Sequence, residues 1–160
     1  MRKAIRENPG FGMIEIVVGV SIISFALFGL ATVGQISIRL SEESSNNTRT
    51  AFLLEEGVEA VKIMRDTSWQ NISALADGND HYLNFNGTTW ATTTADTFVD
   101  GLFERKFKLS GVNRDASSQE IVASGGVSDS GTKKLDVSVS WRSQTGTTTK
   151  TISTYITNLF

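Results

Sequence analysis

The chain has no cysteine and a single proline, Pro9, among its 160 residues. Without thiols it has no disulfide framework, no thiolate metal site and no thiol nucleophile. Because no proline follows residue 9, no residue of that kind interrupts helices or strands in the rest of the chain. The sequence therefore allows long uninterrupted elements that are held together by packing alone.

An excess of positive charge is also missing, since 15 Lys and Arg face 17 Asp and Glu and the formal net charge is −2. Nucleic acid is therefore not a predicted partner. His81 is the only histidine, is expected in a surface loop, and has no second His or Cys with which to bind a metal or build a triad. Adjacent acids such as Glu42 and Glu43 point in different directions on a helix. The chain is predicted not to be an enzyme and to carry no cofactor.

What the sequence does contain is one long apolar run, from Phe11 to Ile38. A helix of this length crosses a hydrocarbon core about 30 Å thick. The basic residues Arg2, Lys3 and Arg6 precede the run, so the amino terminus is predicted to stay in the cytoplasm and residues after about 40 to lie outside it. This pattern predicts a single-pass protein of the cytoplasmic membrane.

Glu15 is the one ionisable residue inside the apolar run. A lone ionised side chain in lipid costs at least about 2.5 kcal/mol, so such a residue normally faces a partner or serves a function. Glu15 lies near the cytoplasmic end of the run, so it can instead reach toward the headgroups. The sequence alone leaves both interpretations open.

The basic leader ends in Gly10 and is followed by Phe11 and then Glu15, which resembles the class III signal of type IV prepilins and pseudopilins. The resemblance implies that prepilin peptidase cuts between Gly10 and Phe11 and methylates the new amine of Phe11. It also implies that Glu15 pairs with the amino terminus of a neighbouring subunit during assembly. A buried carboxylate is tolerated when an ammonium group meets it. Gly12 and Met13 depart mildly from the family, which more often has Thr and Leu there.

Other types of signal explain this segment less well. A secretory signal peptide has a shorter apolar core and a small-x-small cleavage site, and residues Ala31 to Gln35 offer no convincing site. A plain signal anchor leaves Gly10, Phe11 and Glu15 as coincidences. The favoured interpretation is a structural subunit of a type IV pilus or pilus-like filament. The alternatives are a minor pseudopilin of a type II secretion or DNA-uptake system, and an anchored binding or adhesive domain that does not polymerise.

The filament interpretation implies a set of partners and locations. The partners are other pilin-like subunits, prepilin peptidase, a membrane assembly platform and, before assembly, the lipid bilayer. After assembly the subunit is expected in an extracellular filament or a cell-envelope pseudopilus.

The helix is expected to continue past the apolar run, because residues 41–50 contain neither Pro nor Gly. A second apolar stripe then recurs at helical spacing, and the helix is expected to end near Asp66 to Ser68. The members of the stripe are Ala51, Leu54, Val58, Val61 and Met64. Glycine weakens a helix, so any unwinding during assembly is predicted between Gly29 and Gly34.

The remainder of the chain predicts an antiparallel sheet. Residues 135–142 alternate between apolar and polar, a turn follows at Ser143 to Gly146, and residues 148–159 complete a hairpin. Further strands are expected at 82–85, 88–93 and 103–112, whereas 113–133 is expected to be a long loop with a short apolar interruption at Ile121 and Val122. The fold class is therefore α+β, with the helix stripe covering the sheet. The expected parts are a leader (1–10), an assembly segment (11–38), an amphipathic helix (39–66) and a β-rich globular domain (67–160).

Several smaller features complete the sequence-based expectations. Asp77 to Asp80 could bind calcium weakly, but Asp-Gly-Asn-Asp is above all a turn sequence without EF-hand spacing. The Asn-x-Ser/Thr matches are expected by chance in a chain so rich in Ser and Thr. Trp141 is predicted to lie in the core and Trp69 to cap it. Trp90 is the best candidate among the tryptophans for an exposed contact, although an exposed contact is not the favoured interpretation for it either.

Overall fold

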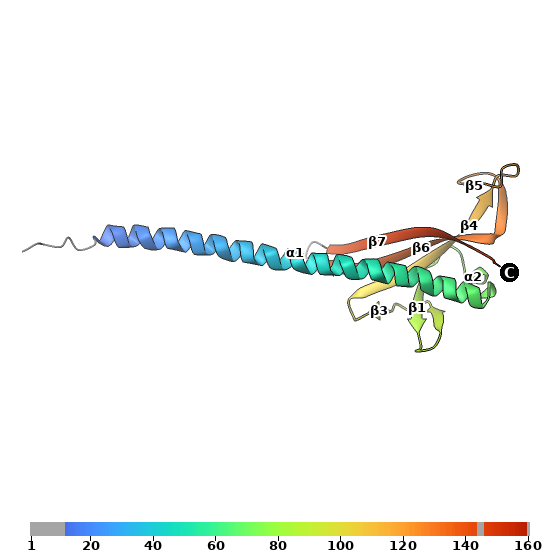
Figure 1. Ribbon diagram of the computed structural model, residues 1–160, viewed down its shortest axis with the longest axis horizontal. Coiled ribbons are helices and arrows are strands. Elements are labelled where there is room, and N and C mark those ends of the chain that lie inside the picture. Colours follow the sequence, from blue (N-terminus) through green and yellow to red (C-terminus); the bar gives the residue numbers. More distant parts are fainter. Residues whose placement is uncertain (1–11, 144–145, 160) are drawn as a thin grey trace, which may run out of the picture. The chain divides into compact units, whose positions relative to one another are not determined.

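The computed structural model describes residues 12–143 and 146–159 (Figure 1). The chain forms two compact units, Met1–Ser44 and Ser45–Phe160. Helix α1, Met13–Thr67, contributes residues to both units. This element confirms the prediction of one long amino-terminal helix that ends near residue 67.

In the first unit, α1 exposes almost all of its apolar side chains. Two of its hydroxyl groups hydrogen-bond to the helix backbone. Ser21 donates to the Val17 carbonyl at 2.7 Å, and Ser24 donates to the Val20 carbonyl at 2.7 Å. Such bonds satisfy the hydroxyl donors within the helix, which matters where no water is available. The helix is long and apolar enough to span a membrane and lies near the amino terminus, a position that a signal sequence also occupies.

The second unit combines the last part of α1 with an antiparallel sheet. The sheet has the order β2-β1-β4-β6-β7, and β3 and β5 each pair with β4. The remaining elements are α2 (Gln70–Ser73), β1 (His81–Phe85), β2 (Trp90–Thr93), β3 (Phe98–Val99), β4 (Phe103–Arg114), β5 (Ile121–Val122), β6 (Val127–Ser143) and β7 (Gly146–Thr157). This arrangement confirms the α+β fold class and the carboxyl-terminal hairpin.

One face of the sheet packs on α1 and forms the core. The alternation predicted for β4 and β6 holds, because every second side chain is buried from Phe103 to Leu109 and from Leu135 to Trp141. The buried residues of the two strands that face α1 are Phe103, Phe107, Leu109, Leu135, Val137, Val139 and Trp141. On α1, Leu54, Val58, Val61 and Met64 are buried as predicted, whereas Ala51 is exposed and Leu53, Gly57 and Ala60 complete the face.

The predicted long loop at residues 113–133 is wrong. Strand β4 continues to Arg114, β6 already begins at Val127, and the two remain paired out to Arg114↔Val127. A register shift between Gly111 and Val112 separates this extension from the main sheet. The pairing there rests on backbone hydrogen bonds between largely polar residues, so no apolar alternation marks these strands in the sequence.

His81 also differs from the sequence expectation. His81 does not lie in a surface loop: its side chain is buried in β1, its Nε2 donates to the Ala76 carbonyl at 3.0 Å, and its ring centroid lies 5.4 Å from that of Phe107. Trp90 is half-buried and packs against the core. Trp141 is buried and Trp69 packs against the core, as predicted.

Candidate assembly site

The predicted processing site lies outside the described residues. Gly10 and Phe11 both precede Gly12, where the description of the chain begins. Cleavage between Gly10 and Phe11 and methylation of Phe11 therefore stay predictions. Of the three site residues that the sequence suggested, only Glu15 has a described environment.

Glu15 lies in the first turn of α1. The backbone N–H of Gly12 donates to Glu15 Oε2 at 2.8 Å. Because α1 begins at Met13, Glu15 is the third helical residue and bonds back to the residue before the helix, as in half of a capping box. The positive end of the helix dipole also favours a carboxylate at this position. The fold thus holds this carboxylate at the head of the apolar helix.

The contact with Gly12 leaves most of the carboxylate free to accept other donors. A carboxylate has two oxygens with about four acceptor positions, and this N–H occupies one of them. The neighbouring side chains offer no hydrogen bond, because Met13, Ile14 and Ile16 are apolar and exposed. A cationic donor in the same apolar surroundings would therefore find one acceptor group, Glu15, and no competing side chain beside it.

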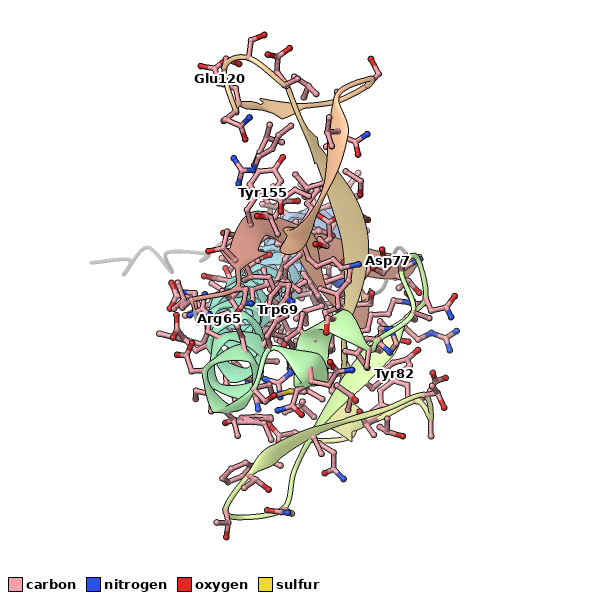
Figure 2. The ribbon with its side chains drawn as sticks, turned by 90° about the vertical axis from the view of Figure 1, so that its right-hand side faces the viewer. Arg65, Trp69, Asp77, Tyr82, Glu120 and Tyr155 are labelled. Atoms are coloured by element: carbon pink, nitrogen blue, oxygen red, sulfur yellow. The ribbon has the colours of Figure 1, made fainter. Side chains whose placement is uncertain are left out.

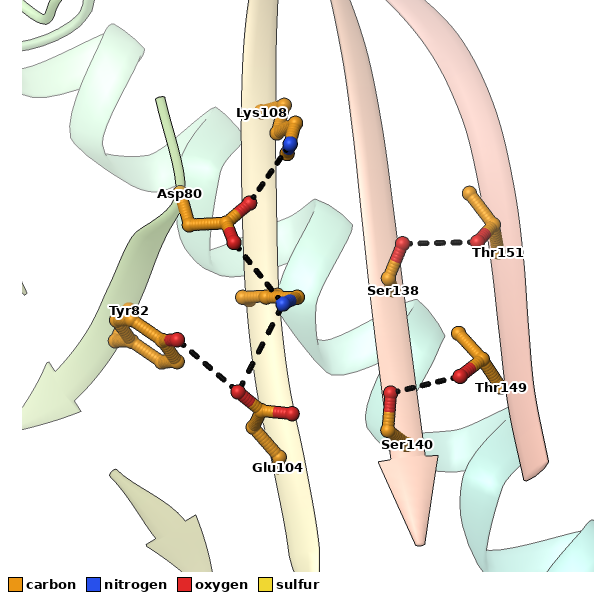
Figure 3. Close-up of polar contacts among 9 residues, drawn as sticks. Asp80, Tyr82, Glu104, Lys108, Ser138, Ser140, Thr149 and Thr151 are labelled. Carbon is orange, nitrogen blue, oxygen red and sulfur yellow. Dashed lines mark hydrogen bonds and ion pairs between the residues drawn. The ribbon is translucent and has the colours of Figure 1, made fainter. Parts of the chain in front are cut away.

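On the outer face of β4, away from α1, the charged residues form ion pairs (Figure 3). Lys106 Nζ lies 3.0 Å from Asp80 and 3.8 Å from Glu104, and Lys108 Nζ lies 3.2 Å from Asp80. The hydrogen bond from Lys106 holds the pKa of Asp80 below its usual range, and the same bond raises the pKa of Lys106. Tyr82 donates its hydroxyl to Glu104 at 3.0 Å.

These ion pairs bear on the calcium possibility at Asp77 to Asp80. Both carboxylates are engaged by lysines, since Lys133 Nζ lies 2.7 Å from Asp77 in addition to the contacts of Asp80. Across the described residues there is no group of three or more His, Cys, Asp or Glu that could hold a metal ion. Calcium would have to displace the lysines, so the structure gives this possibility no support.

Next to the ion pairs, the outer face of β6 and β7 carries hydroxyl groups bonded across the strands (Figure 3). Ser138 and Thr151 are 2.8 Å apart, and Ser140 and Thr149 are 3.0 Å apart. These bonds consume the hydroxyls in pairs. On this part of the outer face, the hydroxyl groups of β6 and β7 hydrogen-bond to one another and so stabilise the register of the hairpin.

Sequence reasoning missed Arg105, a buried cation on the helix-facing side of the sheet. Its side chain is 5% exposed, its Nη1 lies 2.8 Å from Glu56 Oε2, and its guanidinium carbon lies 5.3 Å from the centroid of the Trp90 ring. The signal was available, because the alternation of β4 places Arg105 on the same face as Phe103 and Phe107. Arg105 links α1, β4 and β2 and is a structural residue of the second unit.

A long amino-terminal apolar helix packed on an antiparallel sheet is a pilin-like architecture. Comparisons of the chain with protein-family models, with curated proteins and with solved structures returned no match. The architecture and the position of Glu15 therefore carry the functional interpretation.

Proposed function

We propose that the chain is a structural subunit of a type IV pilus or pilus-like filament. It is inserted in the cytoplasmic membrane, processed by prepilin peptidase and polymerised through the first part of α1. The observation that carries this proposal is Glu15, the single ionisable side chain between Phe11 and Ile38, at the head of a helix that leads into a folded sheet domain. A carboxylate held in this position is poorly explained by membrane anchoring alone.

The proposed chemistry is an ion pair between neighbouring subunits. Removal of the leader leaves an ammonium group on Phe11, four residues before Glu15 in the sequence. A carboxylate in apolar surroundings is costly when alone and tolerable when a cation meets it there, so contact between the amine of one subunit and Glu15 of the next is favoured. Because the two groups meet at one level along the helices, the pair also sets the axial register of the filament.

The remaining apolar side chains supply the contact area. Before assembly they face lipid, and in the filament they face the helices of neighbouring subunits drawn together by the membrane assembly platform. A contact between two different surfaces of identical subunits generates an open helical polymer when the rotation does not close into a ring. The leader contains three basic side chains and one acidic side chain, so its removal shifts the formal net charge from −2 to about −4.

The processing part of the proposal is tested on the mature protein isolated from the producing cells. Mass spectrometry should find an amino terminus at Phe11 that carries one methyl group. A chain that keeps its first ten residues, or that is cut at another position, contradicts the proposal.

The assembly part is tested with Glu15→Gln and with Glu43→Gln as the matched control. Both acids are on α1, but Glu43 lies beyond the apolar run and contacts no cation among the described residues. The Glu15 variant should be processed and membrane-inserted yet absent from sheared filaments, while the Glu43 variant assembles normally. If Glu15→Gln leaves the surface function and location unchanged and no filament is found for either protein, the chain is an anchored domain that does not polymerise.

A further inference from the structure

The basic side chains of the second unit are almost all paired within the unit. Nine of them form ion pairs with carboxylates: Arg49, Lys62, Arg65, Arg105, Lys106, Lys108, Arg114, Lys133 and Lys134. Within the described part of this unit, the exceptions are Arg142 and Lys150. These two cations lie near the turn that joins β6 to β7, and residues 137–160 contain no acid. We call the strand ends that carry Arg142 and Lys150 the basic end.

The opposite end of β6 is acidic. The arm, residues 112–132, consists of the extension of β4 and β6 together with β5, and it contains three acids and one arginine. Figure 2 shows the arm projecting from the rest of the second unit, with Glu120 near its tip. Glu120 has no cation partner among the described residues, and the carboxylate of Asp115 accepts hydrogen bonds from the backbone N–H groups of Ser117 and Ser118.

The arm also contains a hollow that is lined in part by carboxylates. The hollow has a volume of about 430 Å³ and is lined by residues that include Arg114, Asp115, Gln119 and Val127. The guanidinium of Arg114 is already engaged by Asp129 at 2.6 Å and by the Gln119 carbonyl at 2.8 Å. Backbone hydrogen bonds from Ser118 and Ser117 lower the pKa of Asp115, so its negative charge persists. The hollow therefore has an anion without a countercharge.

We propose that the arm of one copy receives the basic end of the next copy, so that Arg142 and Lys150, which project from the two faces of the hairpin, lie close to the negative charges of Asp115 and Glu120. This inference rests on the proposed filament function and names the contact between the globular units. The charges are complementary: the arm lies at one end of β6, and Arg142 lies at the other end of β6 with Lys150 on the neighbouring strand β7. Like ends repel and unlike ends attract, so the contact is head-to-tail. Repeated contacts of this kind propagate without closing.

The absence of cysteine permits a direct test of this contact. Ser117→Cys places a thiol on the arm and Thr147→Cys places one on the basic end, and both positions are exposed. Filaments sheared from cells that produce the full-length double variant should give a ladder of dimers, trimers and longer species after mild oxidation, seen on a non-reducing gel. Each single-cysteine variant should stay monomeric on that gel. Absence of the ladder, or dimers from either single variant, overturns the proposed contact.

Charge reversal gives a second test that is independent of thiol geometry. Glu120→Lys alone and Arg142→Glu with Lys150→Glu should each lower the filament yield several-fold, and the three changes together should restore it. The matched control is Glu55→Lys, which reverses another acid without a cation partner among the described residues, on α1, and should leave the yield unchanged. If reversal at the basic end lowers the yield but Glu120→Lys does not, another partner occupies that end and the proposal is wrong.

The two proposals fail in different ways. If filament assembly is lost in Glu15→Gln but the yield is unchanged in all the charge-reversal variants, the proposed function stands and only the contact between the arm and the basic end is wrong. If filaments form equally well with Glu15→Gln, the proposed assembly mechanism fails whatever the arm does.

Discussion

At the scale of single residues, Gly57 is a position where α1 approaches the sheet closely. A Cβ atom there would lie 2.7 Å from Val137 Cγ1 and 3.4 Å from Arg105 Cδ. The β-branched Val137 has little rotamer freedom with which to move away. Alanine gains up to about 1 kcal/mol of helix propensity over glycine, but overpacking a core costs about 1–3 kcal/mol.

Gly57→Ala is therefore expected to destabilise the second unit by about 1–2 kcal/mol, since the overpacking exceeds the propensity gain. The measurement is urea unfolding of the full chain in detergent, followed by tryptophan fluorescence, because all three tryptophans belong to the second unit. Ser45→Ala, on an exposed part of α1, is the control for helix propensity and should not lower stability. A Gly57→Ala protein as stable as the parent would show that the sheet accommodates the methyl group.

The pair of Arg105 and Glu56 gives a second prediction at this scale. Arg105 is buried whereas the side chain of Glu56 is 49% exposed, so loss of the carboxylate leaves a buried cation without its countercharge. Exposure of Glu56 reduces the effect from the 3–5 kcal/mol of a fully buried pair, and Glu56→Gln is expected to cost about 1–2 kcal/mol. Arg105→Met with Glu56→Gln should recover most of that loss, because an apolar side chain of similar length needs no partner.

The same fluorescence-monitored urea unfolding measures the stability of these variants. The control is Glu59→Gln, which breaks an exposed pair with Lys62 and should change stability by less than about 1 kcal/mol. Equal effects of Glu56→Gln and Glu59→Gln would mean that Arg105 is stabilised by Trp90 and the surrounding packing alone.

At the scale of elements, the hairpin of β1 and β2 is joined to the sheet by a short seam. Strand β1 pairs with β4 at only two positions, His81↔Phe107 and Tyr82↔Lys106. The ion pairs of Asp80 with Lys106 and Lys108 reinforce this seam. By contrast, β6 and β7 pair along twelve positions, from Thr132↔Thr157 to Ser143↔Gly146. The first hairpin should therefore open before the second.

Acid is expected to loosen this first hairpin selectively. The pKa of Asp80 is lowered in the folded state, so its contribution is complete above the unfolded value near 4 and is lost as the pH falls below that value through the folded pKa. Hydrogen exchange should show amides of β1 and β2 losing protection relative to those of β6 and β7 as the pH falls below about 4. Asp80→Asn should remove this pH dependence. Uniform loss of protection across all strands would contradict the expected order.

The helices and strands also differ in how well they could be predicted from the sequence alone. The long helix, the face of β4 and the hairpin of β6 and β7 were predictable, because their apolar residues repeat at the spacing of a helix or a strand. The arm was not, since its strands are polar and paired through the backbone. His81 was predicted in a surface loop because turn residues precede it, whereas it is in fact the first residue of a buried strand. Glu15 was identified from its charge in an apolar run, whereas Arg105 was overlooked in an otherwise alternating strand.

At the scale of the whole molecule, the two units have different tasks in the proposed filament. The first unit exposes an apolar helix with one carboxylate at its head, and the second unit carries a self-contained core under a polar outer face. Lateral packing of helices and end-to-end contact of globular units are separate interactions. Variants of Glu15 and variants of the arm should therefore each change filament assembly while the second unit stays folded.

The helix itself provides the last prediction. Helix α1 is continuous through Gly29 and Gly34, and a Cβ atom at either position would meet nothing within 4 Å. Each glycine weakens the helix by about 1 kcal/mol relative to alanine, so this stretch is the first to unwind if packing in a filament demands it. Gly29→Ala with Gly34→Ala should leave membrane insertion unchanged and reduce the yield of filaments. A map of the parent filament should show interrupted helical density between these residues, and an unbroken helix there would exclude unwinding as a step of assembly.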